Sequence, residues 1–142
     1  MGICGDDYTI SRQGRVVTIR MLGDIHDTET ISSIADTLKV YLAKRAVKYG
    51  PLALLVDIRS CTDFRPAHVL STIGILIDGE GVVMSHTCGS AVLINMNSTL
   101  THLRSMFRSM YKPVRPFHVC GVESEALEFL GTLPHHSPAG VR

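Results

Sequence analysis

The chain has 142 residues, of which 45% are hydrophobic and 19% are charged. This length suits one domain that folds without disulfide or metal staples, and this apolar content excludes a disordered segment. Lys and Arg number 14 and Asp and Glu number 13, and the resulting net charge of +1 argues against nucleic acid as the partner.

Targeting and redox signals point to a cytoplasmic protein. No stretch approaches the roughly 18 consecutive apolar residues of a membrane-spanning helix, so we expect no stable membrane insertion. Residues 1–7 contain Asp6 and Asp7 and no apolar run, so we expect no secretory signal and a flexible N-terminus. The four cysteines form no Cys-x-x-Cys pair, which is typical of reduced cytoplasmic thiols.

The chain opens with a predicted β-hairpin and a long helix. Residues 8–11 and 16–22 read as strands, and Gly14 suits the turn between them. Asp27 then caps an amphipathic helix, and Gly50 followed by a proline ends it. The apolar stripe of this helix consists of Ile31, Ile34, Ala35, Leu38, Leu42 and Ala46.

The rest of the chain alternates strands and helices. The continuous apolar run 52–57 is typical of a strand buried on both faces. Further strands are predicted at 91–94 and 117–120, and helices at 66–77, from Asn97 or Ser98 to Met110, and at 124–130. We expect residues 132–142, which contain two prolines, to form a loose tail.

This order predicts a single α/β domain over residues 8–131. The elements run β-β-α-β-α-β-α-β-α, and alternating strands and helices imply a parallel sheet with right-handed helical crossovers. The hairpin makes the first strand antiparallel, so the sequence predicts a mostly parallel, five-stranded sheet.

This pattern resembles the SpoIIAA-like superfamily, which includes STAS domains and the related Sec14-type, CRAL-TRIO proteins. The resemblance covers about residues 8–131 and is closest to small stand-alone STAS/Sec14-like proteins. It is carried by the opening hairpin, by Leu54-Leu55-Val56-Asp57, and by a closing strand and acidic helix at 114–119 and 123–130. The resemblance implies a SpoIIAA-like βα superhelix and a regulatory or protein-interaction module. The phospho-acceptor motif Asp-Ser-Ser-Gly of such proteins is missing, because residues 65–68 read Arg-Pro-Ala-His.

Polar residues follow the predicted strands, at the sheet edge where ligands and partners of open α/β sheets bind. The same residue types also cap helices and turns, which is the competing interpretation. The candidate binding residues are Asp24, His26, Asp57, Ser60, Thr62, Asp63, Asn95, Asn97 and Ser98. Gly23, Arg59, Gly121 and Glu123 lie in the same predicted loops.

Two further patterns have a functional and a purely structural interpretation. His86-x-Cys88 and His118-x-Cys120 would offer four zinc ligands if their strands were neighbours, but we expect no metal and simple burial of both cysteines. Arg104, Arg108 and Lys112 recur every four residues and form a stripe for an anionic partner, or else the solvated face of a helix.

The leading hypothesis is a non-enzymatic regulatory module with a protein partner and no cofactor. No nucleophile elbow and no glycine-rich phosphate loop is present, and we assign no catalytic residue. A carrier of a small apolar ligand is the first alternative, and a small hydrolase or metal enzyme using Asp24, His26, Asp57 and Asp63 is the second. Homodimerisation is left open.

Overall fold

The computed structural model describes residues 2–23, 27–60, 86–95 and 116–133. The predicted helices at 66–77 and beyond Asn97, and residues 134–142, lie outside this part of the chain. The described elements are β1 (Ile3–Cys4), β2 (Tyr8–Gln13), β3 (Val16–Met21), α1 (Thr28–Tyr49), β4 (Leu52–Asp57), β5 (Thr87–Leu93), β6 (Phe117–Cys120) and α5 (Glu123–Gly131).

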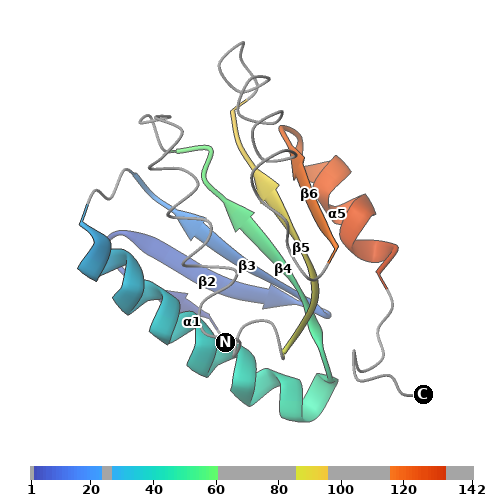
Figure 1. Cartoon of the computed structure of the whole chain (residues 1–142), viewed down its shortest axis with the longest axis horizontal. Coiled ribbons are helices and arrows are strands. Elements are labelled where there is room, and N and C mark those ends of the chain that lie inside the picture. Colours follow the sequence, from blue (N-terminus) through green and yellow to red (C-terminus); the bar gives the residue numbers. More distant parts are fainter. Residues whose placement is uncertain (1, 24–26, 61–85, 96–115, 134–142) are drawn as a thin grey trace.

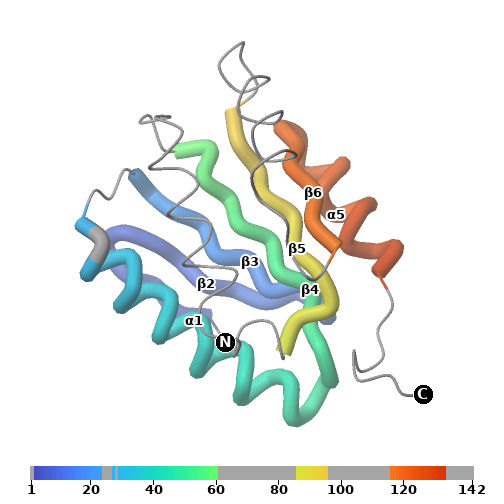
Figure 2. The backbone as a smooth tube through the Cα atoms, in the orientation of Figure 1, coloured from blue at the N-terminus to red at the C-terminus, as the bar shows by residue number. Residues whose placement is uncertain are grey.

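The sheet confirms the predicted α/β class and adds one strand to it. Among the described residues it has six strands in the order β1-β2-β3-β4-β5-β6, where five were predicted (Figures 1 and 2). β1, β2 and β3 pair antiparallel, and β3 to β6 pair parallel. The extra strand lies in the segment predicted to be flexible, where Ile3 pairs with Ile10. A strand of two residues shows no alternation, so its pattern could not reveal it.

The β2–β3 hairpin is confirmed, and its turn is anchored to a distant part of the chain. Gly14 has a φ of 60°, which a residue with a side chain rarely adopts. The guanidinium of Arg15 donates hydrogen bonds to the carbonyl oxygens of Tyr49 and of Pro51, the latter at 2.7 Å. The turn is therefore tied to the connection between α1 and β4.

Helix α1 begins and ends at the predicted caps. The side chain of Asp27 accepts from the backbone N–H of Glu29 at 3.1 Å, and the hydroxyl of Thr30 donates to the same carboxylate at 2.8 Å. Gly50, with a φ of 76°, donates its N–H to the carbonyl of Ala46. Of the predicted apolar stripe, Ile31, Ile34, Ala35, Leu38 and Leu42 are buried.

The two helices of the described ranges, α1 and α5, cover opposite faces of the sheet (Figure 1). Successive strand side chains point to opposite faces, so Leu54 and Val56 join the cluster beneath α1, while Leu55 joins the cluster beneath α5. Every residue of β4 is buried, as its continuous apolar sequence predicts. None of the helices in the described ranges is both long and apolar enough to cross a membrane.

Strand β5 and the end of α5 extend beyond their predicted limits. β5 begins at Thr87 rather than Ala91. Within this added part, Gly89 passes close to Leu133 and Pro116, which a Cβ there would meet at 2.5 Å and 3.1 Å. Glycine is depleted in strands, so its sequence signal is weak. Leu133, predicted to lie in the loose tail, is buried in the cluster beneath α5.

Candidate functional site

Charged side chains meet at the carboxyl end of β4 and form what we call the strand-end cluster: Arg20, Asp57, Arg59 and Glu123. Asp57 is the last residue of β4 and is only 2% exposed. In the parallel register it lies beside Arg20 of β3. Glu123 is the first residue of α5 and brings a second carboxylate to the same place.

Hydrogen bonds from both arginines fix the Asp57 carboxylate. Its Oδ2 accepts from Arg20 Nε and from Arg59 Nη2, both at 2.8 Å. Its Oδ1 accepts from the backbone N–H and from the Nε of Arg59, both at 3.0 Å. Arg59 thus binds the carboxylate through two side-chain nitrogens, and this bidentate geometry strengthens arginine–carboxylate pairs.

Glu123 and Asn95 extend the cluster outward. Arg59 Nη2 donates to Glu123 Oε1 at 3.2 Å, and Arg20 Nη2 lies 3.9 Å from the same oxygen. Asn95, which follows β5, donates its side-chain N–H to the carbonyl of Arg59 at 2.6 Å. The side chains of Arg20, Arg59 and Glu123 are 42%, 34% and 45% exposed, so solvent reaches the outer part of the cluster.

The electrostatics of Asp57 disfavour the role of a proton acceptor near neutral pH. Burial alone would raise the pKa of its carboxyl, but the hydrogen bonds from Arg59 and Arg20 outweigh burial and hold this pKa below its ordinary value. A general base works best with a pKa near the operating pH and a free lone pair facing the substrate. The carboxylate instead orients Arg59, whose own pKa is raised by the same contact.

Apolar surface and a groove flank the strand-end cluster. Val122, just before α5, and Leu127 within it are 55% and 43% exposed. Between α5 and the β2–β3 hairpin lies a groove of about 430 Å³. Its lining comes from Gln13, Arg15, Val16, Thr18, Glu123, Leu127, Leu130 and Gly131. Glu123 therefore belongs to both the cluster and the groove.

The structure brings several candidate residues from the sequence to this edge. Asp57 and Asn95 each contact Arg59 there, while Ser60 is exposed at the start of the loop after β4. Other candidate residues lie outside the described part of the chain, and for them the sequence prediction stands alone: Asp24, His26, Thr62, Asp63, Asn97 and Ser98, and the basic stripe Arg104, Arg108 and Lys112.

Arg20 is a member of the cluster that the sequence analysis missed. It lies in a strand whose Val17, Ile19 and Met21 are buried, so alternation alone places it on the opposite face. Its contact with Asp57 depends on the pairing of β3 with β4. A cation at the carboxyl end of a predicted strand was the signal that could have found it.

The four-ligand zinc arrangement of His86, Cys88, His118 and Cys120 does not form. Although β5 and β6 are neighbours, His118 pairs with Ala91 and Cys120 with Leu93. Cys88 lies three residues before Ala91, which is about 10 Å along a strand. Its sulfur instead lies 3.6 Å from the carbonyl oxygen of Leu52, and both cysteines are buried, as expected.

Comparison with known proteins identifies the fold. No family model and no curated protein sequence matches the chain. The structure of the anti-sigma factor antagonist SpoIIAA in its unphosphorylated form is similar with a TM-score of 0.55 and 16% identity, covering 89% of this chain and 99% of that one.

Two further similar structures contain SiaC from Pseudomonas aeruginosa. One is the diguanylate cyclase SiaD in complex with its activator SiaC, and the other is apo-SiaC. The complex is similar with a TM-score of 0.47 and 17% identity, covering 86% of this chain and 99% of that one. Apo-SiaC is similar with a TM-score of 0.44 and 15% identity, covering 85% of this chain and 98% of that one. The SpoIIAA comparison shows that the chain has the predicted SpoIIAA-like fold, whereas the likeness to Sec14-type and CRAL-TRIO proteins stays a prediction.

Proposed function

We propose that this chain is a non-enzymatic regulatory module that binds a protein partner at the carboxyl edge of its sheet. The observation that carries the proposal is the strand-end cluster, in which a buried Asp57 holds two half-exposed arginines in fixed positions. Ordered arginine side chains lose little freedom on binding, and arginine is enriched in protein interfaces.

The surroundings of the cluster support a protein partner over a small polar substrate. Val122 precedes Glu123 in the chain, and Leu127 lines the same groove as Glu123, so both add exposed apolar area near the charges. A patch that combines apolar side chains with a polar rim has the composition of a protein interface. A partner surface that offers a carboxylate to Arg20 and Arg59 and an apolar side chain to Val122 would complement it.

The fold gives independent support. SpoIIAA is, by its description, an antagonist of an anti-sigma factor, so that protein acts through another protein. We extend this mode of action to the present chain, without the phosphorylation step, because the Asp-Ser-Ser-Gly motif is missing. The candidate residues outside the described ranges, Asp24, His26, Thr62, Asp63, Asn97 and Ser98, belong to the same proposed surface. The stripe of Arg104, Arg108 and Lys112 is a second proposed contact for an anionic partner.

We place the protein in the cytoplasm. The four cysteines form no Cys-x-x-Cys pair, which is typical of thiols in a reducing compartment. A homodimer is the alternative assembly, and a mass measurement in solution distinguishes it from a complex with a different protein.

A matched pair of surface substitutions tests the proposal. Val122 and Val40 are both 55% exposed, but Val40 lies on α1, away from the cluster. A partner is first captured on the immobilised wild-type chain, identified by mass spectrometry and purified. We expect Val122→Arg to weaken its binding by about tenfold or more, because a large cation then occupies the apolar part of the interface beside two arginines.

The control variant Val40→Arg should bind the purified partner like the wild type. Equal binding by Val122→Arg and wild type would place the interface elsewhere. A larger loss of partner binding in Val40→Arg than in Val122→Arg would place the interface on α1.

A further inference from the structure

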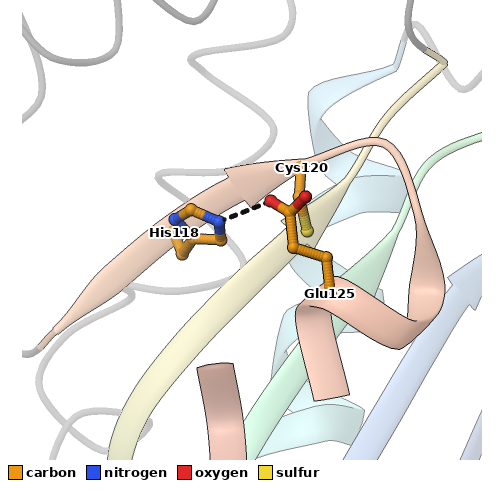
Figure 3. A group of neighbouring side chains, drawn as sticks. All are labelled: His118, Cys120 and Glu125. Carbon is orange, nitrogen blue, oxygen red and sulfur yellow. Dashed lines mark hydrogen bonds and ion pairs between the residues drawn. The ribbon is translucent and has the colours of Figure 1, made fainter. Parts of the chain in front are cut away.

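Three side chains of metal-binding type meet where β6 passes beneath α5. They are His118, Cys120 and Glu125, and their ligand atoms all lie within 4.8 Å of one another (Figure 3). His118 and Cys120 are two residues apart on β6, so they face the same side of the sheet, toward α5. Glu125 lies in the first turn of α5, and its carboxylate points toward the histidine ring.

The local fold holds these groups together before any ligand binds. Only Gly121 and Val122 separate β6 from α5, so the helix folds back directly over the strand. The His118 ring stacks on Phe129 with ring centroids 5.0 Å apart, and its Nε2 lies 2.8 Å from Glu125 Oε2. Cys120 is fully buried, and its carbonyl accepts from the backbone N–H of Ile94, which fixes the strand that carries the thiol.

The chemistry of the donor atoms favours zinc over calcium and magnesium. An imidazole nitrogen, a thiolate sulfur and a carboxylate oxygen form a set suited to zinc, whereas calcium and magnesium require oxygen ligands. Zinc–ligand distances of about 2.0–2.3 Å place tetrahedral ligands about 3.5 Å apart, so small side-chain rotations convert the observed triangle into a zinc site.

We propose that His118, Cys120 and Glu125 bind one zinc ion, which ties α5 to β6. Binding releases the thiol proton of Cys120 to solvent. The proton on His118 Nε2 also leaves that nitrogen by exchange with solvent, so that the neutral imidazole carries its proton on Nδ1. Two metal–ligand bonds then replace the hydrogen bond between His118 and Glu125. His118 and Glu125 are 35% and 49% exposed, so the ion enters from their side and a water molecule completes its coordination. This set shares only His118 and Cys120 with the four-ligand arrangement that the strand register excludes.

Cobalt(II) is the probe that tests the site, because a thiolate ligand gives it a charge-transfer absorption band. Titration of the metal-free chain should give this band with a stoichiometry of one ion per chain, and added zinc should abolish it by competition. We expect Cys120→Ala to remove the band. We expect Glu125→Gln and His118→Gln to weaken binding by at least about tenfold, since even outer-shell changes have effects of that size.

Controls separate this site from the other metal-binding side chains. Glu128→Gln changes another carboxylate of α5, and Cys4→Ser removes an exposed thiol, so both should leave the titration unchanged. Because Glu125 is half-exposed, Glu125→Gln should keep the fold, which circular dichroism checks. A titration without the band, or a band that persists in Cys120→Ala, would overturn the proposal. So would a loss of binding only in a His135→Ala/His136→Ala variant.

Discussion

Asp57 is the residue on which the strand-end cluster depends. It is the only buried carboxylate among the described residues, and four hydrogen bonds from two arginines compensate for its burial. A buried carboxylate is tolerated only when it is paired and hydrogen-bonded in this way. Its removal would leave Arg20 and Arg59 without the group that orients them.

Replacement of Asp57 by asparagine should therefore destabilise the fold in a pH-dependent manner. We expect Asp57→Asn to lower the free energy of unfolding at pH 7 by about 3 kcal/mol, the cost of breaking a buried ion pair. Because the folded-state pKa of Asp57 is lowered, its contribution is fully present above its ordinary pKa of about 3.9. That contribution is lost as the pH falls through the folded-state pKa, so the difference between wild type and variant should shrink in acid.

Urea denaturation from about pH 7 down to about pH 2 measures this difference. Asp36→Asn is the matched control, because the side chain of Asp36 is 76% exposed and its contact with Lys39 is a surface pair. That variant should stay within about 0.5 kcal/mol of wild type. A loss in Asp57→Asn that is equally large at both ends of the pH range would contradict the assigned role of the carboxylate.

Single residues also mark how far the sequence could predict the site. Asp57 and Asn95 were identifiable because Asp57 ends a buried strand and Asn95 follows another, and the ends of parallel strands meet at one edge. Arg20 was not, because its partner lies 37 positions away and depends on strand register. Strand register also separates Cys88 from His118, because the pairing of β5 with β6 places the two His-x-Cys segments at different heights along the strands.

The elements themselves differ in how strongly their sequences specify them. Helix α1 was predicted with correct limits because it carries an amphipathic pattern between its cap Asp27 and the stop signal Gly50. Strand β4 was predicted with correct limits because it is a continuous apolar run that begins soon after Gly50 and ends in Asp57. β1 and the first residues of β5 have no such pattern. They are strands because their neighbours pair with them, as Ile3 does with Ile10.

The contact between β5 and the end of α5 gives a prediction at the scale of elements. A Cβ at residue 89 would lie 2.5 Å from a methyl of Leu133 and 3.1 Å from the carbonyl oxygen of Pro116. Gly89→Ala should therefore lower the free energy of unfolding by about 1–3 kcal/mol, the usual cost of overpacking. Thermal denaturation followed by circular dichroism measures the change.

Gly131→Ala is the control for this substitution. Residue 131 ends α5, and its φ is not positive. Apart from its chain neighbours and the backbone of its own helix, no atom of the described residues lies within 4 Å of a Cβ built there, so alanine should be neutral or stabilising by about 0.5 kcal/mol. If Gly89→Ala were as stable as wild type, the close packing of Leu133 against β5 would be wrong.

At the scale of the whole molecule, the apolar core and the proposed binding edge lie in different places. The two apolar clusters lie between the sheet and its helices, while the strand-end cluster lies at the edge where β3, β4 and β5 end. The edge depends on this order of strands, because Arg20, Asp57 and Asn95 come from three consecutive strands or the loops that follow them. Glu123 joins the cluster because α5 begins at this residue, which lies within ion-pair distance of Arg59.

We propose that a protein partner docks at this edge, and site-specific photo-crosslinking examines that contact in the intact chain. A photo-reactive amino acid is placed at position 122 and, in a matched control chain, at position 40, which is equally exposed at 55%. We predict a covalent adduct with one partner protein from position 122 and none from position 40. An adduct from position 40 alone, equal adducts from both positions, or an adduct only with a second copy of this chain would contradict the claim.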